Sequence, residues 1–167
     1  LPNYMQEVLG VDIGNVIINN RLANWQNGFR EGGYSTIPIV ENAFESLRRL
    51  SNERFGDRIV VISKCSLESQ PKVLLWLADN DFFFFFGISP DRIFFCLERF
   101  EKERLCKDHL VTHFIDDRLE VLGYLINTVP HLYALNPDKD ELETFKEFLP
   151  RVTVAGDWNE ILQELLG

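Results

Sequence analysis

Short runs of β-branched and aromatic residues alternate with longer amphipathic stretches along most of the chain. The apolar runs cover residues 8–13, 58–63, 92–96, 112–115, 131–135 and 151–154. Within each run the apolar positions are nearly continuous, which is typical of parallel strands that are covered on both faces. The pattern therefore predicts six buried strands.

Between these runs, apolar residues recur at spacings of three and four. This periodicity predicts helices over residues 39–50, 70–80, 118–125 and 140–148. A last helix is expected to begin after Asp157, an N-cap residue that has Glu160 three positions later. The alternation of strands and helices predicts an α/β domain, with a doubly wound, mainly parallel sheet and helices on both of its faces.

Two segments interrupt this alternation. Residues 19–38 are polar and rich in glycine, and they predict a short flap within a single domain that spans residues 1–167. Residues 82–86 are five consecutive phenylalanines, which cannot all face one side of a helix or strand. We expect them to form the end of a helix that is buried on several sides and stops at Gly87. An exposed patch for a partner protein is the alternative.

Charge and cysteine content narrow the function. The chain has 17 Lys and Arg residues against 26 Asp and Glu residues, a formal net charge of −9. An acidic surface disfavours binding to nucleic acid and to anionic membranes. Cys65, Cys96 and Cys106 show no pairing or metal-binding spacing, which predicts reduced thiols in a cytoplasmic protein. No signal peptide or membrane-spanning run is recognisable, and the oligomeric state stays open.

Small polar or acidic residues follow three of the predicted strands. Asp12 lies at the end of the first, Ser63 ends the second, and Asp116 and Asp117 follow the fourth. In an open α/β sheet, ligands bind beyond the carboxyl ends of the strands. Carboxylates that meet there repel one another unless a cation lies among them, and Mg²⁺ is the usual cation where phosphate also binds.

A lysine near these carboxylates would complete a pocket for an anion, and Lys64, Lys102 and Lys107 are the candidates. The residues alone therefore predict a Mg²⁺-assisted phosphate site with a carboxylate nucleophile. The three histidines show no metal-ligand spacing and are interpreted as structural.

Four segments carry a resemblance to a known family. VLGVDIGNVI, VVIS, EKERLCKDHLVTHFIDD and THFIDDRLEVL resemble the four motifs of the haloacid dehalogenase-like (HAD) hydrolase superfamily. The resemblance extends over residues 8–166 and implies a HAD-like Rossmannoid core. In the motif that supplies a lysine, Lys102 is the best placed and Lys107 is second.

The resemblance also implies roles for these residues. Asp12 would attack phosphorus and form an aspartyl phosphate, and Ser63 and Lys102 would hold the transferring phosphoryl group. Mg²⁺ would bind Asp12, the Gly14 carbonyl and Asp116, with Asp117 nearby or bound through water. The expected activity is a Mg²⁺-dependent phosphatase acting on an unidentified phosphorylated substrate, small or large, because the short flap predicts an open rim.

One position departs from the family pattern. Phosphatases of this superfamily usually carry a second aspartate two residues after the nucleophile, and here that position is Gly14. Glycine cannot transfer a proton, and loss of a positioned acid–base group costs roughly 10²–10⁴-fold in rate. Asn15 is a candidate substitute that orients water, or else a turn residue. A protein that binds a phosphorylated ligand or partner without efficient turnover is therefore the alternative, and halide removal is a third.

Other phosphate-binding folds fit the chain less well. GVDIGN resembles the first phosphate loop of actin-like sugar kinases, but that fold needs a second lobe and a longer chain. Receiver domains carry their acidic pair after the first strand, whereas here it follows the fourth. The chain also lacks the glycine motifs of P-loop and dinucleotide-binding proteins.

Overall fold

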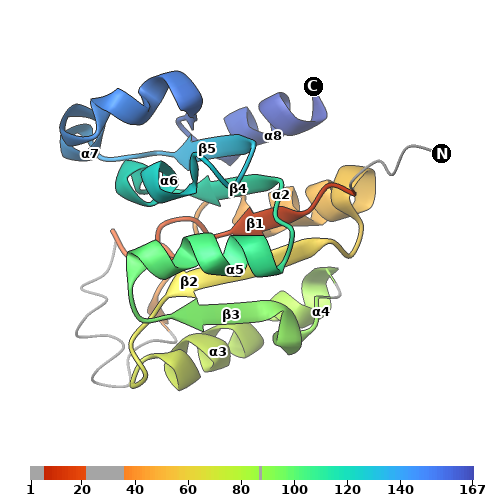
Figure 1. Ribbon diagram of the computed structural model, residues 1–167. Helices are drawn as coiled ribbons and strands as arrows, with labels where there is room; N and C mark the ends of the chain where they lie inside the picture. The colour runs from red at the N-terminus through yellow and green to blue at the C-terminus, as the bar shows by residue number, and fades with distance from the viewer. Residues whose placement is uncertain (1–5, 22–35, 87) are drawn as a thin grey trace.

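Six parallel strands form one sheet in the order β3-β2-β1-β4-β5-β6 (Figure 1). The computed structural model describes residues 6–21, 36–86 and 88–167. The strands are β1 (Leu9–Val11), β2 (Ile59–Lys64), β3 (Ile93–Cys96), β4 (His113–Asp116), β5 (His131–Leu135) and β6 (Thr153–Ala155). Each of the six predicted runs overlaps one strand, although β2, β4 and β6 extend one residue beyond the carboxyl ends of their runs, and the predicted α/β class with a parallel sheet is confirmed.

Helices cover both faces of this sheet. One face carries α2 (Ala43–Leu50), α3 (Gln70–Asp79), α4 (Phe82–Phe86) and α8 (Trp158–Leu166), and the other carries α5 (Lys102–Asp108), α6 (Leu119–Leu125) and α7 (Lys139–Thr144). Figure 1 shows α5 and α6 together on one side of the strands. Among the described residues, no helix is long and apolar enough to cross a membrane.

Because helices cover both faces of the sheet, each strand appears in the sequence as a continuous apolar run. Successive side chains of a strand point to opposite faces. In β2, Ile59 and Val61 pack into the cluster beneath α2 and α8, while Val60 and Ile62 pack into the cluster beneath α5 and α6. Both sets need apolar side chains, so no polar alternation remains in the sequence.

Helix boundaries differ from the prediction in three places. The helix expected over 39–50 begins at Ala43 and continues as a π-helical turn, Ser51–Phe55. The helix expected over 140–148 is split into α7 and a 3₁₀ segment, Lys146–Arg151, which contains Pro150. Sequence reasoning missed α5, because only two of its residues, Lys102 and Cys106, are buried and they form no apolar stripe.

The phenylalanine run forms α4, a helix of its own. Asp81 interrupts the chain after α3 with a left-handed backbone (φ 60°), so the predicted continuation of the preceding helix is wrong. Phe82 is fully buried and packs edge-to-face on Phe44, with 5.5 Å between ring centroids. Phe84 points away from the core and is 90 % exposed. Gly87 and most of the predicted flap at 19–38 lie outside the described residues.

Candidate active site

The site lies where the strand order reverses direction, between β1 and β4. These two strands are neighbours, with Val11 paired to Ile115, and the Asp12 amide donates to the Ile115 carbonyl at 3.0 Å. Asp12 therefore lies beside Asp116, the last residue of β4. The carboxyl ends of parallel strands at such a reversal form the usual ligand crevice of open α/β sheets.

Three carboxylates gather at this crevice. Asp12, Asp116 and Asp117 each place an oxygen within 4.8 Å of the others, and all three residues are buried. Each follows or ends an apolar strand, so neighbouring core residues hold its backbone in place. The structure thus brings together the three aspartates that the sequence pattern singled out.

Lys102 is the buried cation among these carboxylates. Its Nζ lies 3.0 Å from Asp12 Oδ1 and 2.9 Å from Asp116 Oδ2. A cation in the first turn of a helix is disfavoured by the helix dipole, so the two carboxylates compensate for its position at the start of α5. Lys107, the second candidate from the sequence, is exposed one and a half turns later and pairs with Glu103 at 3.4 Å.

One buried ammonium does not balance the charge of three carboxylates, and the pKa values of two of the carboxyl groups are raised. Burial raises the pKa of Asp12 to about 6, with a further contribution from Asp116 and opposition from Lys102. Burial, Asp116 and Asp12 together raise the pKa of Asp117 to about 8. Burial alone would lower the pKa of Lys102, but the charges of Asp116 and Asp12 raise it above its usual value.

This imbalance fits a divalent cation. When all three carboxylates are ionised, the one ammonium leaves two negative charges, which one divalent ion would neutralise. Carboxylate and carbonyl oxygens are the ligands preferred by hard cations. Asp12, Asp116 and Asp117 are therefore the residues to hold such an ion, and Gly14 lines the same cavity.

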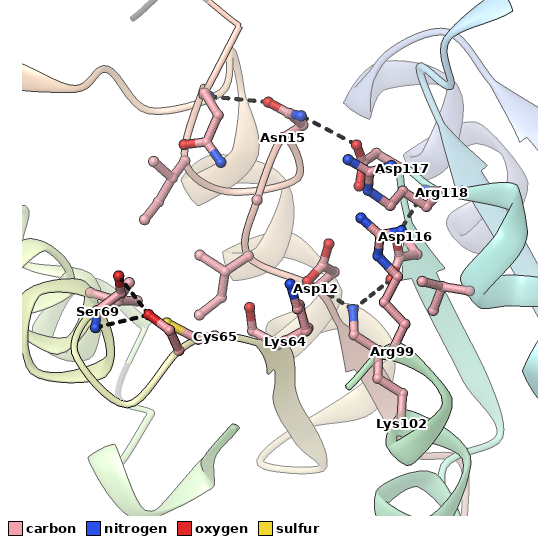
Figure 2. Close-up of a pocket in the computed structure, with 18 residues that line it drawn as sticks. Asp12, Asn15, Lys64, Cys65, Ser69, Arg99, Lys102, Asp116, Asp117 and Arg118 are labelled. Carbon is pink, nitrogen blue, oxygen red and sulfur yellow. Dashed lines mark hydrogen bonds and ion pairs between the residues drawn. The ribbon is translucent and has the colours of Figure 1, made fainter. Parts of the chain in front are cut away.

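A cavity of about 260 Å³ opens above these groups. Figure 2 shows the residues that line it. Besides the groups described above, they include Ser63, which the sequence predicted, and three further cations, Lys64, Arg99 and Arg118. Lys64 was a candidate from the sequence. Arg99 and Arg118 were missed, because nothing in their sequence pattern separates them from other surface arginines.

Asn15, in the loop after β1, is hydrogen-bonded to Asp117 (Figure 2). Its backbone is left-handed (φ 58°), its Nδ2 donates to Asp117 Oδ2 at 3.3 Å, and its Oδ1 accepts from the Asn20 amide at 3.1 Å. Asn15 is thus both a turn residue and a neighbour of the carboxylates. Gly14 has no positive φ, and a Cβ placed there would lie 3.1 Å from Asn20 Nδ2.

Histidines and cysteines take no polar role at the cavity. Among the described residues, no histidine lines it. His113 and His131 begin β4 and β5, at the ends of these strands away from the cavity, and their rings stack with 4.4 Å between centroids. All three cysteines are free and buried, as predicted. Cys65 lines the cavity, but burial raises the pKa of its thiol to about 11, so it remains protonated at neutral pH.

The acidity of Asp117 predicts that the metal-free protein loses stability as pH rises from about 6.5 to about 8, the pKa of this carboxyl in the folded state. Its folded pKa of about 8 lies above the ordinary 3.8, so the folded state binds a proton in this window that the unfolded state has already lost. His113, whose pKa burial lowers to about 4, is neutral throughout it. Urea unfolding at several pH values, with chelator present, measures the slope.

Asp117→Asn is the matched variant for this measurement. It keeps the side-chain shape but removes the titration, so its stability should vary less with pH across the same window. Added Mg²⁺ should stabilise the wild type most at the alkaline end, where all three carboxylates are free to bind it. An identical slope in the wild type and Asp117→Asn would contradict the assignment.

No protein-family model matches the chain, and no curated protein matches it either. Solved structures do match it over nearly its whole length. A haloacid dehalogenase-like hydrolase from Burkholderia xenovorans has a TM-score of 0.67 and 13 % identity, covering 97 % of this chain and 99 % of its own. D,D-heptose 1,7-bisphosphate phosphatase from Burkholderia thailandensis has a TM-score of 0.62 and 12 % identity, covering 96 % and 99 %.

A third structure, a haloacid dehalogenase-like family hydrolase from Xanthomonas campestris, has a TM-score of 0.58 and 11 % identity, with 95 % of each chain covered. At such low identity the likeness concerns the fold alone. It agrees with the parallel α/β sheet described above. The chain has the fold of the haloacid dehalogenase-like hydrolases.

Proposed function

We propose that this protein is a Mg²⁺-dependent phosphohydrolase in which Asp12 is the nucleophile. The observation that carries the proposal is the cluster of three buried carboxylates around Lys102, at the reversal point of a HAD-like sheet. A structural role alone does not account for it, because uncompensated buried carboxylates destabilise a fold. One of the structures with the same fold is that of a phosphatase, which supports the reaction class.

In the first step, a carboxylate oxygen of Asp12 forms a bond to phosphorus, and the bond from phosphorus to the leaving oxygen breaks. Lys102 donates hydrogen bonds towards the oxygens that gain negative charge, and the Ser63 hydroxyl helps to hold them. Mg²⁺ held by Asp12, Asp116 and Asp117 would supply the positive charge that lets a phosphate dianion approach the carboxylates.

In the second step, water attacks phosphorus, the bond to the Asp12 oxygen breaks, and inorganic phosphate is released. Both steps gain from a group that moves protons, first to the leaving oxygen and then from water. Gly14 offers none, so we expect solvent to carry these protons. We therefore expect slow turnover, with the second step limiting for substrates whose leaving group needs no proton.

The proposed function is tested by a hydrolysis screen. Release of phosphate from p-nitrophenyl phosphate and from a panel of alkyl phosphates is measured with Mg²⁺ and with chelator. The proposal expects hydrolysis that depends on Mg²⁺. Tight binding of phosphorylated compounds without release of phosphate would favour the alternative that Gly14 suggests, a binding protein without efficient turnover.

Gly14→Asp is expected to increase hydrolysis of alkyl phosphates more than that of p-nitrophenyl phosphate, because only an alkyl leaving group needs protonation. The gain has an upper limit of roughly 10²–10⁴-fold, the contribution of a general acid. The backbone at Gly14 accepts a side chain if Asn20 moves by a few tenths of an ångström. The measurement is the ratio of kcat/KM for the two substrates.

Gly14→Asn is the matched control, since asparagine has the shape of aspartate but transfers no proton. It should leave the ratio of the two kcat/KM values near that of the wild type. If Gly14→Asp, with its fold intact by circular dichroism, gave the same ratio of kcat/KM values as the wild type, the role assigned to position 14 would be contradicted.

A further inference from the structure

The cavity holds more positive charge than Lys102 alone supplies. Lys64, Arg99, Lys102 and Arg118 all line it, which places 4 of the chain's 17 basic residues at one site of a protein whose net charge is −9. Lys102 is committed to Asp12 and Asp116. The other three cations, Lys64, Arg99 and Arg118, have no role in the two steps proposed above.

Lys64 is an exposed cation beside a buried phosphate-binding candidate. It is the last residue of β2 and directly follows Ser63, and it is the exposed residue in an otherwise buried strand. In the part of the chain that the structure describes, its ammonium makes no hydrogen bond and no ion pair. A lysine at a cavity wall with no protein partner is available to an anion that enters the cavity.

Arg99 presents a second set of donors to the same cavity (Figure 2). Its Nη1 pairs with Glu120 at 3.0 Å, which restrains the guanidinium. Its Nε and Nη2 donate to no group among the described residues. Arg118 is held in a similar way, by Glu141 at 3.2 Å, but its own amide also donates to Asp116 Oδ1. It therefore belongs to the acidic side of the site.

We propose that Lys64 and Arg99 bind a second anionic group of the substrate, so that the substrate class is a phosphate monoester carrying a further phosphate or carboxylate. The inference rests on the proposed function, because it assigns the transferring phosphoryl group to Asp12, Ser63 and Lys102. A planar guanidinium with free donors and a mobile ammonium together suit either type of anion. An uncharged remainder of the substrate would leave the Lys64 ammonium and two nitrogens of Arg99, Nε and Nη2, without a partner among the described residues.

Three small esters that share a two-carbon backbone test this proposal. Ethylene glycol monophosphate has a hydroxyl at its far end, ethylene glycol bisphosphate has a phosphate there, and phosphoglycolate has a carboxylate. We expect kcat/KM for one or both of the doubly anionic esters to exceed that of the monophosphate by about tenfold or more, the value of one hydrogen bond between charged groups. Preference for the phosphate or for the carboxylate identifies the second anion.

Lys64→Gln and Arg99→Gln should each reduce this preference by about tenfold. Lys107→Gln is the control: it removes the same charge from an exposed residue of α5 that does not line the cavity. Equal kcat/KM values for all three esters in the wild type would overturn the proposal. So would variants at Lys64 and Arg99 that weaken all three esters to the same extent.

Binding separates this inference from the proposed function. Calorimetry with the Asp12→Asn protein measures the affinity for the three esters in the absence of turnover. If no ester is hydrolysed by the wild type but the doubly anionic esters bind more tightly, and Lys64→Gln removes the difference, the second anion site stands while the phosphatase proposal fails. Equal affinities for all three esters overturn the second anion site, whatever the activity is.

Discussion

Replacing Asp12 with asparagine is expected to reduce kcat by roughly 10⁴–10⁶-fold, the cost of removing a nucleophile or a member of its catalytic unit. The amide is no nucleophile towards phosphorus at neutral pH, while the side chain keeps its volume. The measurement is the release of p-nitrophenolate from p-nitrophenyl phosphate at saturating substrate and Mg²⁺. Phosphatase activity that is retained in this variant would contradict the covalent mechanism.

The same substitution should not destabilise the metal-free protein. Asp12 is one of three buried carboxylates that share one ammonium, and burial and repulsion raise its pKa to about 6. Removing its charge relieves part of that repulsion. The melting temperature of Asp12→Asn in chelator should therefore equal or exceed that of the wild type. Asp108→Asn, at an exposed residue of α5, is the control for loss of a surface carboxylate.

Lys102→Met is expected to damage both activity and stability. It removes the buried cation between Asp12 and Asp116. Removing one partner of a buried ion pair lowers the free energy of unfolding by about 3–5 kcal/mol. The loss corresponds to a fall in melting temperature on the order of 10 °C. Without its donor to the transferring phosphoryl group, kcat should fall by roughly 10²–10³-fold. Thermal unfolding and p-nitrophenyl phosphate hydrolysis measure the two effects.

Lys107→Met is the comparison for this prediction. Lys107 lies in the same helix, but it is exposed and pairs with Glu103 at the surface. Surface ion pairs of this kind contribute about 0–1 kcal/mol, so stability and activity should stay close to wild type. The destabilisation by Lys102→Met should also be smaller at about pH 5, because Asp12, whose pKa is already about 6, can then take up a proton. Equal effects of the two substitutions would contradict the site as described.

The sheet and its acidic cluster could be predicted because their signals are local. Each buried strand needs apolar residues on both faces, which leaves a continuous run in the sequence, and each run is followed by the polar residues of the sheet edge. Asp12 and Asp116 follow from this pattern once the strands are taken as parallel. To predict that the two side chains lie close together, one also needs the register of β1 and β4, which pairs Val11 with Ile115.

Several helix boundaries and two residues of the cavity could not be predicted, because they depend on contacts between residues far apart in the sequence. α5 has only two buried residues, and one of them is a lysine, a residue type that sequence patterns treat as exposed. The left-handed backbone of Asp81 separates α4 from α3, although the residues around it favour a helix. Arg99 and Arg118 reach the cavity from turns, and the direction of an arginine in a turn follows from the glutamate that holds it.

The central claim is that Asp12 forms a covalent bond to phosphorus, and it is tested most directly by trapping the intermediate. The protein is mixed with p-nitrophenyl phosphate and Mg²⁺, quenched in acid after a short time, digested and analysed by mass spectrometry. Because Gly14 provides no group to activate water, the intermediate should accumulate. We predict one phosphoryl group on the peptide that contains Asp12, and none in Asp12→Asn. Turnover with no phosphorylated peptide, or with the phosphoryl group on another residue, would contradict the account.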